Sequence, residues 1–330
     1  MKNRYVVTAS THDLLVRRKP SLTSRKELAT LNAAPSVPAS HADLLDRPLD
    51  VVLTTEMPDG RLQSTVVWFS REGDDLLVNT MQEFRKAKNL RDRPRATLLV
   101  MEPPTAERWI EVRGDVTQRE IGALEHLDAL ARAYAGADRY FGAVVPAELA
   151  ATEHPILCRI RPRSIVVGPS SLPAPVTRSS IEATLPTPRG CGQEPTIPPT
   201  HRELLERPVL AALSTQLRVG AQTHPTWFEL DGSDILINTT LERSKGRNLV
   251  RDPRATVLVL DPDDSNRWIE IRGDVDLETG GAIENLDRVT RRYTSHPRFY
   301  GFVYPEERRS TETRVVARIH PRRINVDAIH

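Results

Sequence analysis

Two short segments place cations where a helix is expected to begin. The second contains Thr239, Arg243, Ser244, Lys245 and Asn248. Cations at a helix N-terminus oppose the helix dipole, but a bound anion would bring free backbone N–H groups and cationic side chains together in one site. The pattern therefore predicts a phosphate or carboxylate site. A solvated basic helix face is the alternative.

The first segment carries cations at the corresponding place, in Arg85 and Lys86, with Asn89 one turn later. Both segments also match the capping box, in which a threonine is followed three residues later by a glutamate. The pairs are Thr80 with Glu83 and Thr239 with Glu242. We therefore expect each threonine to cap a helix, and each glutamate to lie in its first turn.

The four tryptophans and one histidine are further candidates for residues that contact a ligand. The tryptophans are Trp68, Trp109, Trp227 and Trp268. Packing in the core is the usual role of a large aromatic on a strand, and contact with a flavin-like ring system is the sharper alternative. His224 stands before Pro225, Thr226 and Trp227. A single histidine of this kind usually has a structural role.

Composition excludes several classes of protein. The net charge is +2, so the chain lacks the basic excess of a nucleic-acid-binding protein. Two cysteines cannot form a four-cysteine zinc site, and no two histidines have metal-ligand spacing. The longest apolar run, residues 209–213, is far too short to cross a membrane, and no signal-peptide core is visible. We expect a soluble, cytoplasmic protein with no metal and no membrane or nucleic-acid partner.

The chain contains one domain twice. Residues 79–116 and 238–275 align at a shift of 159 without a gap, and 21 of the 38 positions are identical. So long a period indicates a duplicated globular domain rather than a solenoid. The stretch between the copies is rich in proline, which is typical of a linker. The predicted parts are an N-terminal extension (1–40), a first repeat (41–168), a linker (169–199) and a second repeat (200–330).

Periodicity within each repeat predicts mostly strands. In the first repeat the expected strands are 51–57, 64–70, 76–80, 96–102, 108–116 and 156–167, and the expected helices are 82–93 and 121–134. Short antiparallel strands with few helices favour a small barrel over a doubly wound sheet. The predicted fold is therefore mainly β, of the α+β kind, with two barrels in tandem.

In order, the motifs are NT-x₂-ER-x-K-x-x-NL, DPRATVLVLDP, RWIEIRGDV and a helix ending RRY. This order resembles the F-420-dependent class of the pyridoxamine 5′-phosphate oxidase-like superfamily of split β-barrels. The likeness covers about residues 41–168 and 200–328, and it implies a single-chain pseudo-dimer of two split barrels. It implies a cofactor phosphate held by Arg243, Ser244, Lys245 and Asn248, and a ring system lying along His224 to Trp227 and against the partner domain.

The activity that the resemblance implies is hydride transfer from reduced coenzyme F-420 to a small unsaturated molecule. The cofactor carries most of the chemistry in such proteins, so no catalytic residue is assigned. The first repeat departs from the pattern, because Phe84 stands where Arg243 stands and Arg85 where Ser244 stands. We therefore expect an occupied second site and an altered or vacant first site.

Three other readings stay open. The same fold could use FMN as an oxidase or reductase. A haem protein would need an axial ligand, for which His224 and His154 are the candidates. A regulatory or scaffolding protein without catalytic activity is also compatible with the altered first motif.

Overall fold

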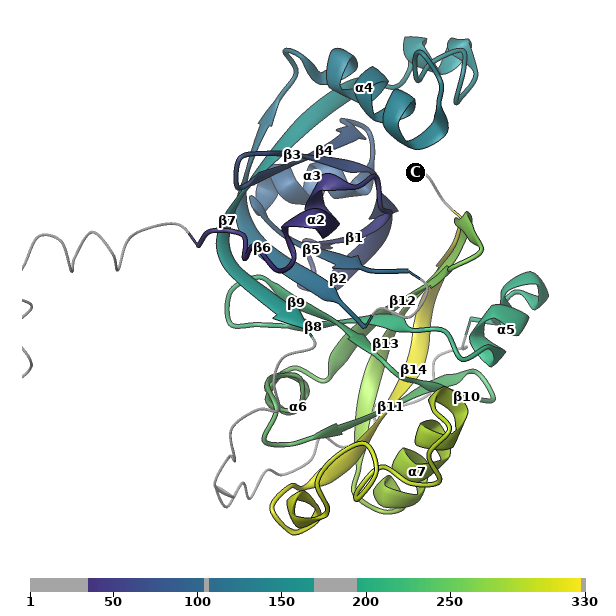
Figure 1. Cartoon of the computed structure of the whole chain (residues 1–330). Helices are drawn as coiled ribbons and strands as arrows, with labels where there is room; N and C mark the ends of the chain where they lie inside the picture. Colours follow the sequence, from purple (N-terminus) through teal and green to yellow (C-terminus); the bar gives the residue numbers. More distant parts are fainter. Residues whose placement is uncertain (1–34, 104–106, 169–194, 328–330) are drawn as a thin grey trace, which may run out of the picture. The chain divides into compact units, whose positions relative to one another are not determined.

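The computed structural model describes residues 35–103, 107–168 and 195–327, which belong to one compact unit (Figure 1). The predicted extension up to residue 34, and the predicted linker up to residue 194, lie outside the described residues. The remainder forms two similar halves, each built around one seven-stranded sheet.

In the first repeat, a short helix α2 (Ala42–Asp46) precedes the sheet. The strands are β1 (Val51–Glu56), β2 (Leu62–Val67), β3 (Phe69–Glu72), β4 (Asp75–Met81), β5 (Arg95–Met101), β6 (Trp109–Arg119) and β7 (Pro155–Gly168). They pair in the order β2-β1-β5-β6-β7-β4-β3. Helix α3 (Arg85–Asp92) follows β4, and α4 (Ala123–Ala135) and the 3₁₀ turn η1 (Ala147–Ala151) connect β6 to β7.

The second repeat has the same element order. Its strands are β8 (Ala211–Gln216), β9 (Ala221–Thr226), β10 (Glu229–Asp231), β11 (Asp234–Thr240), β12 (Arg254–Asp261), β13 (Asp264–Glu278) and β14 (Arg314–Val326). Its helices are α5 (Pro199–Glu206), α6 (Ser244–Arg251), α7 (Ala282–Tyr293) and the 3₁₀ turn η2 (Glu306–Ser310). The sheet order, β10-β11-β14-β13-β12-β8-β9, repeats that of the first half.

Every pairing in both sheets is antiparallel, and each curved sheet encloses its own apolar core (Figure 1). Leu98, Ile110 and Ile160 lie in the first core, and Val257, Ile269 and Ile319 in the second, all fully buried. These residues alternate with outward-facing ones, as the period-2 pattern predicted. The predicted fold, two split β-barrels in tandem, is confirmed.

The prediction of capping boxes was wrong. Thr80 and Thr239 are still strand residues, paired with Ile156 and Val315, and the helices begin only at Arg85 and Ser244. The glutamates have other partners, because the backbone N–H of His154 donates to Glu83 (3.0 Å) and that of Thr313 to Glu242 (3.0 Å). The carboxylates thus tie the turn before the helix to the neighbouring strand, instead of capping the helix.

Two predicted elements also differ in detail. The expected strand 64–70 is two strands, β2 and β3, separated at Trp68. The expected helix 121–134 begins only at Ala123; it buries Leu127, Leu130 and Ala131 and leaves Leu124 48% exposed.

The two repeats are joined by a buried polar network. The hydroxyls of Thr54 and Ser64 from the first repeat, and of Ser214 and Thr223 from the second, bond one another at 2.9–3.1 Å. All four side chains are at most 3% exposed. Because every oxygen has partners, this network costs little to bury and fixes the register between the repeats.

A carboxylate reaches across the interface on each side of these hydroxyls. Glu111 accepts the backbone N–H of Thr223 (2.6 Å), and Glu270 accepts that of Ser64 (2.7 Å). Apolar side chains of both repeats, including Leu99 and Leu258, complete the contact. The duplicated domains therefore form an intramolecular pseudo-dimer.

Candidate functional site

The first turn of α6 is the point at which the predicted anion-binding residues meet. Strand β11 ends at Thr240, and the chain turns through Arg243 into the helix. Gly246 allows the helix to pack on the strand end, since a Cβ there would lie 2.0 Å from the carbonyl oxygen of Thr240. No side chain caps the first turn of α6, so its N–H groups remain available to a ligand.

A hydrogen-bond relay orders the polar side chains beside this turn. Asn248 Nδ2 donates to Gln222 Oε1 (3.0 Å), and Gln222 Nε2 lies 2.9 Å from both Ser244 Oγ and His224 Nε2. His224 Nδ1 lies 3.1 Å from the carbonyl oxygen of Thr223, which can only accept, so the imidazole carries its proton on Nδ1. Ser244 Oγ therefore accepts from Gln222, and its own hydrogen is free to donate to an anion.

Three cations lie at the same place. Burial, followed by the charges of Arg243 and Arg314, lowers the pKa of Lys245 to about 8. Arg243 lies over the ring of Tyr304 (5.6 Å) and 3.8 Å from Glu312. Positive charges that repel one another in a half-buried setting are typical of an anion site.

His224 connects this site to the other repeat. Its ring centroid lies 5.1 Å from that of Trp109. Burial, then the charge of Lys245, lowers the pKa of His224 to about 4, so the ring is neutral near pH 7. The site is thus lined by a neutral imidazole and an indole contributed by the two different repeats.

We expect replacement of His224 by Thr, the residue at the equivalent position 65, to change how stability depends on pH. Unfolded histidine binds its proton near pH 6.5 but folded His224 only near pH 4, so the unfolded state binds more protons between these values. The free energy of unfolding therefore falls as the pH drops through this window. Urea unfolding at several pH values should show a shallower fall for His224→Thr.

Two other groups, His126 and Glu111, also change the pH dependence of stability between about pH 4 and 7. Burial lowers the pKa of His126 to about 4 and raises that of Glu111 to about 7, the latter against the opposing charge of Arg113. Glu111 acts with the opposite sign, since its raised pKa makes stability fall as the pH rises from about 4.5 to 7. His126 and Glu111 contribute in both the parent protein and His224→Thr. If the free energies of unfolding of the two proteins differ by the same amount at every pH from 4 to 6.5, the assignment to His224 is contradicted.

The remaining predicted residues of the second repeat lie in paired strands or in apolar and aromatic clusters. Thr239 is buried in β11, and its Oγ1 has no hydrogen-bond partner among the described residues. Pro225 and Thr226 continue β9 and pair with Ala212 and Ala211. Trp227 stacks on Tyr293 (5.5 Å), and Trp268 is 4% exposed in the apolar contact between the repeats. Both tryptophans thus have the packing environment of a core residue.

The predicted residues of the first repeat are arranged differently. Arg85 is exposed at the start of α3, whereas Lys86 is 5% exposed, with its Nζ 5.5 Å from the ring centroid of Phe84. Asn89 Nδ2 donates to Gln63 and Thr55 (both 3.0 Å), as Asn248 does to the equivalent residues of the second repeat. The scaffold is therefore kept while the residues at the helix start differ.

Sequence reasoning missed four members of the second site. They are Gln222, Tyr304, Glu312 and Arg314. A comparison of the repeats offers a signal for two of them, since position 145 is valine where Tyr304 stands, and position 155 is proline where Arg314 stands. Gln222 and Glu312 are matched by Gln63 and Glu153, so only their contacts identify them.

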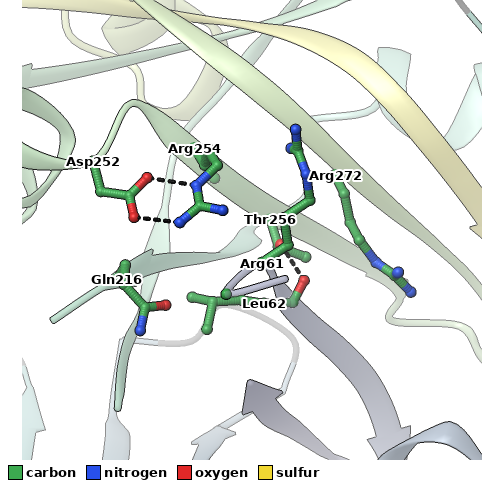
Figure 2. A pocket seen from close by; sticks show the side chains of 9 residues that line it. Arg61, Leu62, Gln216, Asp252, Arg254, Thr256 and Arg272 are labelled. Atoms are coloured by element: carbon green, nitrogen blue, oxygen red, sulfur yellow. Dashed lines mark hydrogen bonds and ion pairs between the residues drawn. The ribbon is translucent and has the colours of Figure 1, made fainter. Parts of the chain in front are cut away.

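Two pockets lined by both repeats contain none of the predicted site residues. In the first, the Asp252 carboxylate accepts two bonds from Arg254, and Thr256 Oγ1 donates to the carbonyl oxygen of Leu62 (Figure 2). Its free volume of about 10 Å³ has room for about one water, so the two repeats are closely packed there. The second has about 180 Å³ and is lined by residues such as Leu49 and Leu260.

No helix in the described part of the chain is long and apolar enough to span a membrane. No group of three or more His, Cys, Asp or Glu side chains among those residues could hold a metal ion.

Comparison with solved structures gives many matches, and the three named below each cover about two fifths of this chain. An F420 reductase is 27% identical over 39% of this chain and 98% of its own, with a TM-score of 0.35. A conserved hypothetical protein from Mycobacterium tuberculosis is 22% identical over 41% and 86%, with a TM-score of 0.32. The haem storage protein HutZ from Vibrio cholerae is 15% identical over 40% and 95%, also with a TM-score of 0.32. No curated protein matches the chain.

One protein family matches both repeats separately. The match covers residues 37–154 and again residues 197–326, which together are more than half of the chain. The second segment spans all seven strands of the second sheet, and the first spans β1 to β6 and ends just before β7. The chain therefore belongs to the pyridoxamine 5′-phosphate oxidase family, as a tandem duplication of its domain.

Proposed function

We propose that the protein is a cofactor-dependent oxidoreductase that binds a phosphate-bearing flavin or deazaflavin at the start of α6, with coenzyme F-420 as the cofactor and FMN as the alternative. The single observation that carries the proposal is the meeting of Lys245, Arg243 and Ser244 at an uncapped helix N-terminus. A phosphate is the ligand that such donors fit.

Unpartnered polar atoms support this fit. Arg243 Nε and Tyr304 Oη are buried and have no hydrogen-bond partner in the described structure, and Tyr304 is only 6% exposed. A buried polar atom left without a partner costs roughly 1–3 kcal/mol. An anion bound at this place would give these donors an acceptor and offset that cost.

The residues of the chain have separate roles in this proposal. Lys245, Arg243, Ser244 and the first N–H groups of α6 would hold the phosphate, and Asn248 would position Ser244 through Gln222. His224 and Trp109 would line the space for the ring system and exclude water from it. When bound, the cofactor would supply hydride transfer to a small unsaturated molecule.

The geometry around the candidate haem ligands favours the flavin or deazaflavin reading. Both ring nitrogens of His224 are engaged, by Thr223 and Gln222. His154 is exposed, and its Nδ1 lies 2.7 Å from Glu83. A haem iron at either histidine would have to compete with these contacts.

The proposal is tested by the absorbance spectrum of the purified protein, and by fluorescence and Soret-band titration with F-420, FMN and haem. We expect saturable binding of F-420, and weaker binding of FMN. A Soret band with no flavin or deazaflavin binding would support the haem alternative. No binding of any of the three would leave a scaffolding role.

A further inference from the structure

We propose that the chain has one anion site, in the second repeat, because the equivalent position in the first repeat has become hydrophobic core. The identity of the ligand rests on the proposed function, but the asymmetry rests on the side chains themselves. Four positions that differ between the repeats, and that are far apart in the sequence, meet at the start of α3 or α6. The pairs are Phe84 and Arg243, Phe141 and Tyr300, Val145 and Tyr304, and Pro155 and Arg314.

In the first repeat these positions form part of an apolar cluster. Phe84, Phe141 and Val145 pack against the buried side chains of Met81 and Tyr140. Phe84 precedes α3 and joins this cluster, whereas Leu90 of α3 lies in the core of the first barrel. Its aromatic ring takes the place at which Arg243 stands in the second repeat.

In the second repeat the same positions form a charged and hydrogen-bonded cluster. Arg314 Nε donates to the hydroxyl of Tyr300 (2.7 Å), which donates to Glu312 (3.0 Å). Arg314 also forms an ion pair with Glu312 (2.9 Å), and Arg243 approaches the same carboxylate. The polar residues thus hold one another in place around Lys245.

The balance of charged side chains also differs between the starts of α3 and α6. Glu312 and the buried Glu242 offset part of the charge of Arg243, Lys245 and Arg314, leaving one cation in excess. The first repeat keeps the corresponding carboxylates, Glu83 and Glu153, but of the three equivalent cations it keeps Lys86 alone, with an exposed Arg85 where Ser244 stands. The second repeat therefore has the larger excess of positive charge for an anion.

Lys86 is the residue that could still bind an anion in the first repeat, and its surroundings argue against it. Burial lowers its pKa to about 8, and its Nζ lies 5.5 Å from the ring centroid of Phe84. At the start of α3, the residue before the helix is the aromatic Phe84, where the second repeat has Arg243, and the first helical residue is the exposed Arg85, where it has Ser244. A phosphate would therefore meet a ring where α6 presents a guanidinium.

The test is the number of ligands bound per chain, measured by equilibrium dialysis of the full-length protein with F-420, with FMN and with inorganic pyrophosphate. We expect one equivalent. Lys245→Met should weaken binding about 10- to 100-fold, as expected for the loss of a charge-assisted contact. Its matched control, Lys86→Met, should leave both affinity and stoichiometry unchanged. Circular dichroism verifies that both variants fold.

A second pair of variants tests how much the residues around Lys245 contribute to binding, apart from the lysine itself. Tyr304→Val and Arg243→Phe give the second repeat the residues of the first, and each should weaken binding while the stoichiometry at saturation stays at one ligand per chain. Two equivalents per chain, or an equal loss from Lys86→Met and Lys245→Met, would overturn the inference and leave the proposed function intact. One equivalent of pyrophosphate without F-420 or FMN would instead overturn the proposed function. Failure of all three ligands to bind would overturn both.

Discussion

Glu270→Ala is expected to lower the free energy of unfolding by about 3–5 kcal/mol, because it leaves buried donors without their acceptor. Glu270 is 1% exposed and accepts from the backbone of Ser64 (2.7 Å), from Arg272 (2.7 Å) and from Asn325 (2.6 Å). Each donor would be left in a space that water fills poorly. Chemical denaturation at pH 8 measures the loss.

The first repeat supplies the matched control for this prediction. Glu111 occupies the equivalent position, but among the described contacts it has only the backbone N–H of Thr223 (2.6 Å) and the ion pair with Arg113 (3.1 Å), because Val166 stands where Asn325 stands. The pKa of Glu111 is raised to about 7 by burial, which reflects this poorer compensation. Substitution by Gln should therefore cost more at position 270 than at position 111. Equal costs would contradict the difference in compensation.

Gly273→Ala is expected to cost about 3 kcal/mol, at the upper end for overpacking, because the clash is with backbone. A Cβ at Gly273 would lie 2.4 Å from the carbonyl oxygen of His320, on the strand that pairs with β13. The pairing shifts register between Arg272 and Gly273, so the strands approach closely at this bulge. No rotamer of alanine can relieve such a contact.

Thermal unfolding of Gly273→Ala and Gly280→Ala tests this claim directly. A Cβ at Gly280 would meet nothing within 4 Å, so that substitution should change stability by less than about 0.5 kcal/mol. Gly114 repeats the arrangement in the first repeat, with a Cβ 2.3 Å from the carbonyl oxygen of Arg161. A stable Gly273→Ala protein would mean that the bulge can open without cost.

The Thr-x-x-Glu pattern did not predict correctly where α3 and α6 begin. Thr-x-x-Glu is a local pattern, and the same letters occur in both copies. In the fold each glutamate finds a backbone N–H 71 residues away, at His154 or Thr313, and the strand extends to the threonine. A capping motif competes with strand pairing, and here pairing prevails.

The residues of the candidate site can likewise be divided into those that the sequence predicted and those that only the fold brings together. The cations at the start of α6, and the basic character of both segments, are visible in the sequence, because a helix N-terminus depends on neighbouring residues. The contact of His224 with Trp109 joins residues 115 positions apart in different repeats. The role of Gln222 as a link between Asn248 and Ser244 likewise depends on the pairing of β8 with β9 and on the packing of α6.

The sequence by itself determined the duplication, the strands with their buried faces, and the two candidate segments, because each of these depends on residues close together in the chain. The tertiary structure alone decided that Phe84, Phe141 and Val145 form an apolar cluster near the start of α3, while Arg243, Tyr304 and Arg314 gather near the start of α6. These side chains come from separate turns and strands. Only the folding of each barrel brings them close enough for dispersion forces in one repeat, and for ion pairs and hydrogen bonds in the other.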